Sequence, residues 1–455
     1  MSRSTVLVVY ANTEHPMRGA AEQHLAAFGR HSAHECVYFN LVRPRSPRWL
    51  SHMTFDAIVF HTSALGIRWS HWDWERTWER LEALSLVAPS VLAYVQDEFY
   101  RTQDVADFVN RFGVTHVFSV APAHEWPKLY PSVDAQRVSF AQVLTGYLDD
   151  QFVTRANAAL ARAPERSIDL GYRAWGPPAW LGRQGQEKIE IARRFEKLGD
   201  AGLRMDISTD HASILIGDDW LDFLLRCRAV LGTESGASLM DIDGSLRPRV
   251  DAYMTANPGA TFEEVERACF EGVDGNLDLR VLSPRHLEAC ATRTCQVLIR
   301  GEYSGVLEAD RHYLALEPDY RNLDDVVSLL RSPDHCRQVA EQAYEDVVAS
   351  GKWSYREFVR GTLDEVVAAR PAQQPQRQAQ RQVQSGRLGR AIARRDDPVW
   401  RRRLALRWWC ARRLSAVTGV LGKQKRVPAG SIANIPMRIS HRLRRWPRAD
   451  SQHHG

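Results

Sequence analysis

The strongest constraint on this chain is the alternation of short apolar runs with helical stretches in its first part. Apolar, β-branched runs occur at 5–10, 35–41, 55–61, 91–95, 116–120 and 138–144. Helical spacing lies between several of them, at 19–28, 72–86 and 102–112. Short continuous apolar strands separated by helices predict a parallel sheet with helices on both of its faces.

A second alternation begins near residue 168. It predicts strands at 167–173, 202–207, 229–232, 296–299 and 312–315, and a helical insert at 248–272 in which Thr261 is the expected cap. The 455 residues exceed what one hydrophobic core usually supports. The predicted fold class is therefore α/β, with two Rossmann-like domains that face a cleft and a basic C-terminal extension. The expected bounds are 1–155 for the first domain and 156–370 for the second.

The C-terminal extension differs sharply from the rest of the chain in charge. Residues 371–455 hold 20 Lys and Arg against 3 Asp and Glu, whereas the whole chain has a net charge of only +5. The Gln- and Arg-rich stretch 371–399 cannot bury much apolar surface and is predicted to be a disordered linker. Residues 400–455 are expected to form a basic, partly helical tail.

Within this tail, arginines are interleaved with Leu and Trp between 400 and 425. That pattern suits the surface of an anionic membrane. A basic appendage without any partner is the alternative. Nucleic acid is not an expected partner, because the charge is not accompanied by a recognisable binding module.

Several other classes of protein lose support from the sequence. No apolar run approaches the roughly 18–20 residues that a membrane-spanning helix needs. The short apolar run at 6–10 lacks a small-residue cleavage site and is interpreted as a strand rather than a signal peptide. The seven cysteines are scattered without CxxC spacing, which favours reduced thiols in the cytoplasm over disulfides or zinc. The first strand is not followed by GxGxxG, so a dinucleotide-dependent oxidoreductase is not favoured.

Polar side chains follow the predicted strands of the first half. His15 follows the first strand, and Asp97 and Glu98 follow the strand at 91–95. Ligands of parallel sheets bind outside the carboxyl ends of the strands, where a carboxylate or imidazole can take a proton from a hydroxyl. These three are the candidate catalytic residues. As an alternative, Asp97 or Glu98 caps the helix that begins near residue 102 or faces water.

A tryptophan-rich stretch at 69–78 places Trp74 and Trp78 on one face of a predicted helix. Aromatic faces suit sugar rings, but such a stripe also forms when a helix packs on a core. Both interpretations stay open at the level of the sequence.

Three loops of the second half have the composition of an anion site. The stretch 171–188 runs from a strand end through Gly and Pro into a helix and carries Arg173, Arg183 and Lys188. Cations beside a helix N-terminus bind anions, since backbone N–H groups and the helix dipole act together. The second loop, 232–238, carries Glu234 and Ser235, and the third, 283–290, carries Arg285 and Glu288. A purely structural turn is the alternative for each loop taken alone.

Several stretches of the sequence resemble a known protein family. The stretch 283–316, SPRHLEACATRTCQVLIRGEYSGVLEADRHYLAL, resembles the donor-binding region of GT-B glycosyltransferases of the "group 1" type and of spore-coat CgeB-like relatives. The stretch 343–358 resembles the closing helices of that family. QDEFYRT, FGVTHVFSVAP, EWPKLYP and VLTGYLDD in the first half look like members found among bacterial polysaccharide genes. The resemblance covers about residues 5–368 and ends before the tail.

The resemblance implies roles for individual residues. Glu288 matches the carboxylate that binds the ribose of the donor, and Arg285 is placed to reach the diphosphate. Arg173, together with either Arg183 or Lys188, matches a basic pair that neutralises the leaving nucleoside diphosphate. Because this pair replaces a metal, the resemblance implies neither a divalent ion nor another cofactor. The nucleoside-diphosphate sugar is the co-substrate.

The chain departs from the family pattern in one respect. Glu234 would correspond to the first of two glutamates that the family separates by seven residues, but a long insert lies between Glu234 and Glu288. Eight positions before Glu288 the chain has Arg280. The role of Glu234 and the stereochemical outcome therefore stay open.

The expected function is metal-independent transfer of a sugar, of the hexosyltransferase type, to an acceptor hydroxyl in the synthesis of cell-surface polysaccharide or glycoconjugate. The expected partners are a nucleotide-sugar donor, a saccharide or lipid-linked acceptor and, through the tail, an anionic membrane. A cytoplasmic protein, peripheral on the inner face of the membrane, would fit these partners. The alternatives are an inactive GT-B-like binding or scaffold protein and a sugar-nucleotide epimerase.

Overall fold

The structure, a computed structural model, describes residues 3–12, 19–43, 46–47, 49–50, 53–84, 86–162, 165–199 and 202–369. The described residues all belong to one compact unit. The predicted linker at 371–399, the predicted tail at 400–455 and the candidate His15 lie outside the described residues.

The first half of the described chain forms a six-stranded sheet in the order β2-β1-β3-β4-β5-β6, in which all neighbouring strands are parallel. The strands are β1 (Thr5–Tyr10), β2 (Glu35–Asn40), β3 (Ala57–Phe60), β4 (Ser90–Val95), β5 (His116–Ser119) and β6 (Ser139–Gln142). Every residue of β1, β3 and β4 is buried, as expected for central parallel strands covered on both faces. The six strands predicted for this half are confirmed.

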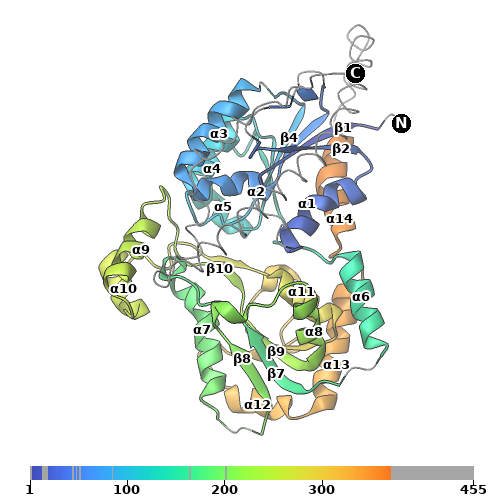
Figure 1. Cartoon of the computed structure of the whole chain (residues 1–455), viewed down its shortest axis with the longest axis vertical. Helices are drawn as coiled ribbons and strands as arrows, with labels where there is room; N and C mark the ends of the chain where they lie inside the picture. The colour runs from blue at the N-terminus through green and yellow to red at the C-terminus, as the bar shows by residue number, and fades with distance from the viewer. Residues whose placement is uncertain are drawn as a thin grey trace, which may run out of the picture. The chain divides into compact units, whose positions relative to one another are not determined.

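The helical segments of this half connect the strands. They are α1 (Gly19–His31), α2 (Thr62–Leu65), η2 (Gly66–Trp69), α3 (His71–Ala83), α4 (Thr102–Arg111), η3 (Ala123–Glu125) and α5 (Trp126–Leu129). Figure 1 shows α1 and α3 beside the first sheet, in the upper part of the view. The stripe of tryptophans on α3 belongs to the core. Trp74 is buried and lies with Trp78 against Phe108 of α4.

The second half forms a five-stranded parallel sheet in the order β13-β12-β9-β7-β8. Its strands are β7 (Ile168–Arg173), β8 (Met205–Ser208), β9 (Cys227–Gly232), β12 (Cys295–Ile299) and β13 (Leu314–Leu316). They correspond to the five predicted strands, although β8 begins three residues later than the expected 202. Its other segments are α6 (Asp150–Leu160), η4 (Ala179–Leu181), α7 (Gly182–Glu196), η5 (His211–Ser213), α8 (Asp218–Arg226), α11 (Pro284–Ala291), η6 (Tyr303–Gly305), α12 (Leu323–Leu330) and α13 (Pro333–Ala343).

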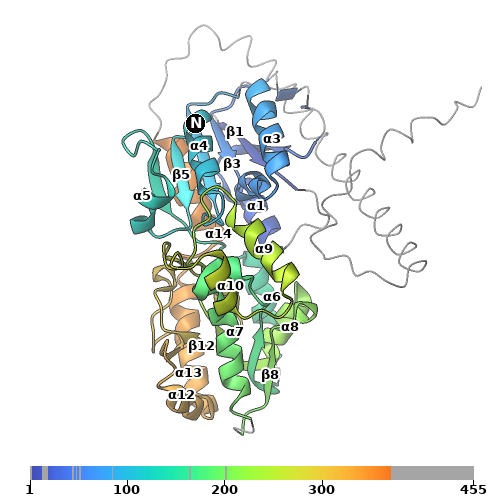
Figure 2. The ribbon, with the colours of Figure 1, turned by 90° about the vertical axis from the view of Figure 1, so that its left-hand side faces the viewer.

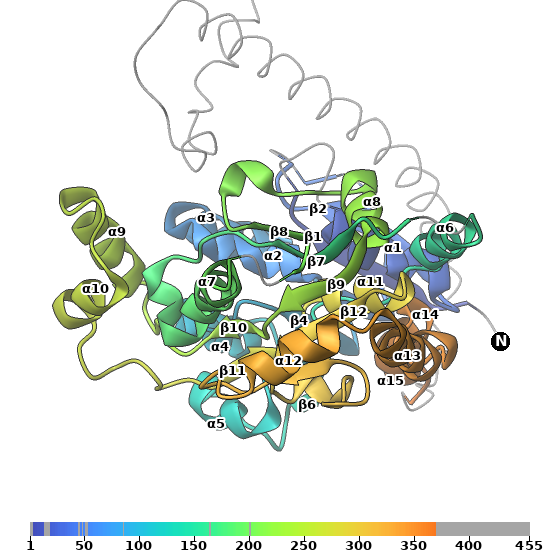
Figure 3. The same cartoon turned by 90° about the horizontal axis from the view of Figure 1, so that it is seen from below.

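Helices cover both faces of the second sheet (Figure 3). On one face, α6, α8 and α11 bury a cluster that includes Phe152, Phe223 and Leu287. On the other face, α7, α12 and α13 bury a separate cluster that includes Phe195 and Val326. These two apolar layers hold the strands rigidly, so the loops at the carboxyl ends of the strands start from fixed points.

The predicted helical insert forms a small lobe of its own. It is enclosed by β10 (Ser235–Ala237) and β11 (Leu279–Val281), which pair antiparallel, and it contains α9 (Leu246–Ala256) and α10 (Phe262–Cys269). Thr261 caps α10 in a capping box with Glu264, as the sequence predicts. Residues of both helices share a small apolar cluster around Val250 and Val265. Figure 1 shows α9 and α10 standing out from the side of the second sheet.

The last helical segments return to the first half. After η7 (Tyr344–Ala349) come α14 (Tyr355–Val359), η8 (Arg360–Asp364) and α15 (Glu365–Ala368). α14 lies beside α1 (Figure 1, Figure 2), and Phe358 is buried in the core of the first half. The Tyr94 hydroxyl of β4 donates to Oγ1 of Thr362 at 2.8 Å. The predicted bounds 1–155 and 156–370 stay a prediction, but contacts of the first core extend to residue 367.

The predicted α/β class with two Rossmann-like parallel sheets is confirmed. Among the described helices, none combines the length and the apolar composition that crossing a membrane requires.

Candidate functional site

Three cationic side chains meet at the carboxyl edge of the second sheet. Arg173 is the last residue of β7, and Arg285 is in the first turn of α11. The Arg285 guanidinium donates through Nη1 to the backbone oxygen of Arg173. Lys188 is in the second turn of α7, and the positive charge of Arg285 helps to lower the pKa of its ammonium group. The sequence predicted these three residues as donor-binding. The fold brings them together at the carboxyl edge of the second sheet, which we call the mouth of that sheet.

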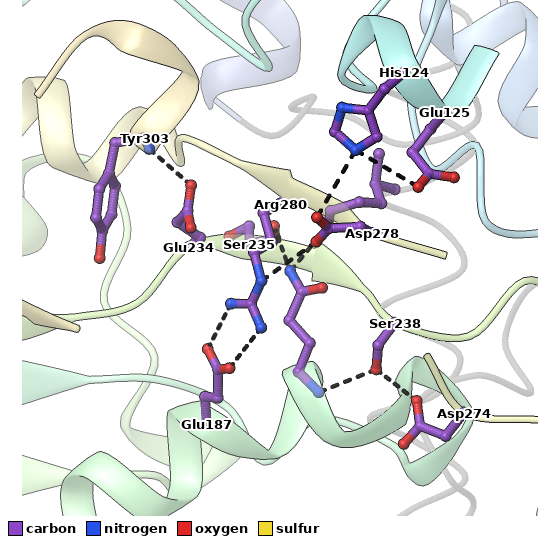
Figure 4. Close-up of polar contacts among 12 residues, drawn as sticks. His124, Glu125, Glu187, Glu234, Ser235, Ser238, Asp274, Asp278, Arg280 and Tyr303 are labelled. Atoms are coloured by element: carbon purple, nitrogen blue, oxygen red, sulfur yellow. Dashed lines mark hydrogen bonds and ion pairs between the residues drawn. The ribbon is translucent and has the colours of Figure 1, made fainter. Parts of the chain in front are cut away.

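Lys188 makes no hydrogen bond or ion pair with any other residue in the part of the chain that the structure describes. Burial lowers the pKa of its ammonium group, and Arg285 lowers it further, while Glu187 raises it. The neighbouring Glu187 is turned to Arg280, whose Nη2 donates to its Oε1 at 2.9 Å (Figure 4). Because Arg280 takes this carboxylate, Lys188 keeps its charge available for an anion from outside the chain.

Arg173 is fixed by the neighbouring strand. Its Nη2 donates to Oδ1 of Asp206 on β8 at 2.7 Å, and Nη1 donates to the backbone oxygen of Asp206 at 2.8 Å. The guanidinium also lies 4.4 Å from the ring centre of Phe223. Arg173 therefore contributes a positioned charge that is already shared with one carboxylate, in contrast to Lys188.

Glu288 lies on α11 one turn after Arg285. Its Oε2 accepts a hydrogen bond from Nε1 of Trp220 at 2.7 Å, and burial raises the pKa of its carboxyl to about 7. The Arg285 guanidinium lies 4.6 Å from the ring centre of Trp220 and opposes this rise. Glu288 lines a small hollow together with Gln23 of α1 and Tyr355 of α14. A carboxylate in this place can accept hydrogen bonds from hydroxyl groups of a ligand.

Trp220 was not singled out from the sequence. It lies in α8, and an apolar helical face gives no sign of the atom that its indole N–H contacts. A buried Trp usually needs a hydrogen-bond acceptor for its indole N–H. This general requirement is the only feature of the sequence that indicates a polar partner for Trp220.

The sequence left open whether Arg183 or Lys188 completes the basic pair. Arg183 is exposed and points to the insert, where its Nη2 donates to Glu266 at 2.6 Å and its guanidinium lies 5.1 Å from the ring centre of Phe262. This placement favours Lys188. Both partners of Arg183 lie on α10 of the insert, and the sequence of the loop 171–188 gives no sign that the insert lies beside it.

The predicted anion site at the start of α7 has an occupant from the chain itself. Oδ2 of Asp274 accepts from the backbone N–H of Arg183 at 2.7 Å, and Oγ of Ser238 accepts from that of Gln184 at 3.2 Å. Ser238 in turn donates to Asp274 at 2.6 Å (Figure 4). The Asp274 carboxylate and the Ser238 hydroxyl thus satisfy the first N–H groups of α7, which are no longer open to a ligand anion.

Glu234 and Ser235 lie where β10 begins. The pairing of Gly236 with Arg280 across the hairpin places Glu234 near Arg280 despite the insert between them (Figure 4). Glu234 is buried, and its Oε1 accepts from the backbone N–H of Tyr303 at 2.8 Å. Burial raises the pKa of its carboxyl, whereas Arg280 lowers it. Ser235 contributes its backbone oxygen, which accepts from Nε2 of Gln184 at 3.2 Å. The bond between Glu234 and Tyr303 holds the loop after β12, and the bond between Ser235 and Gln184 joins β10 to α7.

Asp97 and Glu98 follow β4, as predicted, but their surroundings differ. Glu98 is fully buried and accepts hydrogen bonds from Ser119 at 2.6 Å, from the backbone N–H groups of Val120 and Ala121, and from Tyr130. These four bonds occupy both of its oxygens, so Glu98 has no free position from which to take a proton from a substrate. Its role is to hold the loop after β5.

Asp97 is exposed and has a positive φ of 54°, a conformation that costs energy outside glycine. The buried Arg68 donates to the backbone oxygens of Gln96, Asp97 and Tyr100 at 2.6, 2.7 and 3.0 Å. Arg68, which the sequence did not single out, therefore holds the loop that presents Asp97. His15 lies outside the described residues.

Within the described residues, no group of three or more His, Cys, Asp or Glu side chains has an arrangement that could hold a metal ion. The cysteines there are free thiols.

No family model matches this chain, and no curated protein matches it. Among solved structures, HepE from Anabaena in complex with UDP and glucose aligns with 81% of this chain and 100% of its own, at 10% identity and a TM-score of 0.44. Sucrose-phosphate synthase from Thermosynechococcus elongatus aligns with 81% and 100%, at 11% identity and a TM-score of 0.42. AviGT4, a glycosyltransferase involved in avilamycin A biosynthesis, aligns with 81% and 99%, at 12% identity and a TM-score of 0.39. Because these TM-scores lie below 0.5, the function is argued below from the residues of this chain.

Proposed function

We propose that this protein is a glycosyltransferase that moves a sugar from a nucleoside-diphosphate sugar to an acceptor hydroxyl. The observation that carries the proposal is Lys188, which has no hydrogen bond or ion pair within the described residues and lies with Arg173 and Arg285 at the carboxyl edge of the second sheet. Arg285 is one helical turn before Glu288. A desolvated cation without an acid partner destabilises the empty protein and is satisfied by a ligand anion. The resemblance of 283–316 to a donor-binding region, noted from the sequence, points to the same ligand.

The chemistry follows from the charges at this mouth. When the bond between the sugar and the diphosphate breaks, negative charge develops on the departing phosphate. Lys188 and Arg285 stabilise that charge, and they act strongly because protein replaces water around them. Glu288 accepts hydrogen bonds from the ribose hydroxyls and holds the nucleoside in place. These side chains supply positive charge without a metal, so metal-independent transfer of a hexose is part of the proposal.

The acceptor hydroxyl must lose its proton as the new glycosidic bond forms. Asp97 is the candidate base in this proposal, since its carboxylate is exposed and its loop is held by Arg68. Glu98 is not carried forward, because its oxygens are already occupied.

We further propose a saccharide or lipid-linked acceptor and a role in the synthesis of cell-surface polysaccharide or glycoconjugate. This part rests on the resemblance and on the basic residues at 400–455, which suit an anionic membrane surface. Cosedimentation with vesicles containing anionic lipid, compared between the full chain and a chain ending at 369, tests the membrane. Equal binding of both chains would remove the tail from the proposal.

The test of the donor site is thermal stabilisation of the full chain by a panel of nucleotide sugars in the absence of divalent metal. Ligand at a hundred times its dissociation constant adds about 2.7 kcal/mol to the free energy of unfolding. We expect stabilisation by one class of nucleotide, its loss in Lys188→Met, and its retention in the matched variant Arg183→Met. Stabilisation that depends on Arg183 and not on Lys188 would overturn the assignment.

Product analysis separates the three functions that the sequence left open. Transfer to an acceptor, or slow donor hydrolysis without one, is the result that the proposal expects. Donor binding with neither reaction would favour a binding or scaffold protein. A free epimerised nucleotide sugar, formed with no acceptor consumed, would favour an epimerase.

A further inference from the structure

One aromatic side chain at the mouth of the second sheet has no role in the proposal so far. Trp175 follows Arg173 by two residues on the loop that leaves β7, and 45% of its surface is exposed to solvent. Exposing an indole to water is unfavourable, and exposed tryptophans mark binding surfaces more often than other apolar residues do. The other large exposed apolar side chains of the described residues include Val87 in the first half and Ile216 after η5.

The backbone around Trp175 is held in place. Arg173 pairs with Ser208 in the register of β7 and β8, and the N–H of Ala174 donates to the oxygen of Ser208 at 3.1 Å. The indole N–H donates to the backbone oxygen of Gly176, which fixes the direction of the ring. Trp175 therefore belongs to the ordered edge of the sheet.

A second ring flanks the first. His211 of η5 follows β8 and is exposed, and its ring centre lies 6.1 Å from that of Trp175 with 47° between the planes. This tilt is too large for the two rings to cover each other face to face. Because β7 and β8 are adjacent and parallel, both rings leave the same edge of the sheet.

The cations proposed for the diphosphate lie directly beside this loop. Arg285 donates to the backbone oxygen of Arg173, only two residues before Trp175. A ligand with an anionic group at Lys188 and Arg285 thus has an open aromatic face within reach along the same edge. A nucleoside diphosphate joins these two chemistries, a planar ring and adjacent phosphates, in one molecule.

We propose that Trp175 stacks on the base of the nucleoside diphosphate, with His211 at its side. The inference rests on the proposed donor site and adds to it the side chains that bind the base. Stacking tolerates any base, because every base has a π-face. Trp175 therefore raises the affinity for nucleotides in general and leaves the choice among bases to hydrogen-bonding groups elsewhere.

The experiment compares a ligand that has both chemistries with one that has the phosphates alone. Isothermal titration calorimetry of the full chain, without metal, measures UDP, ADP, GDP and inorganic pyrophosphate. Stacking is worth about tenfold or more in affinity per base. We expect Trp175→Ala to weaken all three nucleotides about tenfold while pyrophosphate changes less than about twofold. Trp175→Phe should retain most of the affinity, and Val87→Ala is the control for loss of an exposed apolar side chain.

Each alternative result has a distinct meaning. Unchanged nucleotide binding in Trp175→Ala would overturn the stacking role. An equal loss for pyrophosphate would also overturn it, since that result means that the loop itself has moved. If the wild-type protein binds pyrophosphate as tightly as nucleotides, the base is not recognised and only this inference fails. If it binds neither class, the donor site of the proposed function fails as well.

Discussion

Lys188 combines two properties that a purely structural lysine does not combine, partial burial and the lack of an acid partner in the described chain. Replacing it with Met removes a desolvated charge and keeps most of the apolar stem. We expect the free energy of unfolding of Lys188→Met to stay unchanged or to rise by up to about 1 kcal/mol. Affinity for the nucleotide sugar should fall about tenfold or more, because a charge-assisted contact is lost. Denaturant titration and calorimetry measure the two quantities.

The matched control is Lys197→Met, at the exposed C-terminal end of the same helix. That variant should leave nucleotide binding unchanged. A loss of more than about 2 kcal/mol in the stability of Lys188→Met would show that the ammonium group has a structural partner, against the present assignment.

Glu288 makes the stability of the protein depend on pH in an unusual direction. Its pKa in the folded protein is about 7, above the ordinary 4.5, so the folded state holds a proton that the unfolded state releases. This contribution is complete below pH 4.5 and is lost as the pH rises through 7. In Glu288→Gln, whose amide oxygen still accepts from Trp220, the loss should disappear. Denaturant titrations at pH 5 and pH 8 should differ between wild type and variant by on the order of 2 kcal/mol. Parallel pH dependence in the two proteins would contradict the raised pKa.

At the scale of elements, two buried charged side chains, Arg68 and Glu98, hold the loop 96–101 and the loop after β5. Arg68 binds the backbone oxygens of the loop, and Glu98 binds the next loop through Ser119, Val120 and Ala121. Positive φ angles at Asp97 and Arg101 are tolerated because these bonds fix the backbone. These bonds restrain the loop, which suits Asp97 in its proposed role as the base.

Glu98→Gln tests this structural role. The amide has one acceptor oxygen instead of two, and its NH₂ group meets backbone N–H donors that the carboxylate satisfied. We expect the free energy of unfolding to fall by about 2–3 kcal/mol, as for a buried, charge-assisted hydrogen-bond network. The pH profile of transfer by the remaining folded protein should not change. A shifted profile together with normal stability would return Glu98 to the list of candidate bases.

The sequence predicted the strands of both sheets because most of them lie in short runs of apolar residues, such as β1, β3 and β4. It did not predict β10 and β11, which have three residues each and are too short to give a strand pattern of their own. Their pairing decides that Glu234 lies near Arg280, although a long insert separates the two residues in the sequence. The choice between Arg183 and Lys188 was open for a similar reason, since only the fold of the insert places Glu266 beside Arg183.

At the scale of the whole described chain, α14 follows the second sheet in the sequence but completes the core of the first. Phe358 is buried against His24, Phe28 and Tyr94 of the first half. We expect Phe358→Ala to cost about 3–5 kcal/mol, as a buried aromatic truncation does. Fluorescence and circular dichroism should report loss of the first sheet together with that of the second. Melting of the two sheets in separate transitions would contradict this expectation.

The matched comparison is Phe262→Ala in the insert, which belongs to a separate small cluster. This change should leave the melting of the two sheets nearly unaltered.

The sequence anticipated helices at 343–358 from the resemblance, but it assigned them to the second domain. Contacts such as that between Tyr94 and Thr362, 268 residues apart, leave no local pattern from which they could be predicted.

The return of α14 and η8 to the first sheet also bears on how the protein is made. A ribosome that has just completed β6 has synthesised all six strands of the first sheet but not Phe358 or Leu363, which complete its core. The nascent first half must therefore keep an apolar surface uncovered while more than 200 further residues are translated. Synthesis from the N-terminus thus gives no early folded intermediate that is complete in itself, and chaperones that bind exposed apolar surface should meet this chain during most of its translation.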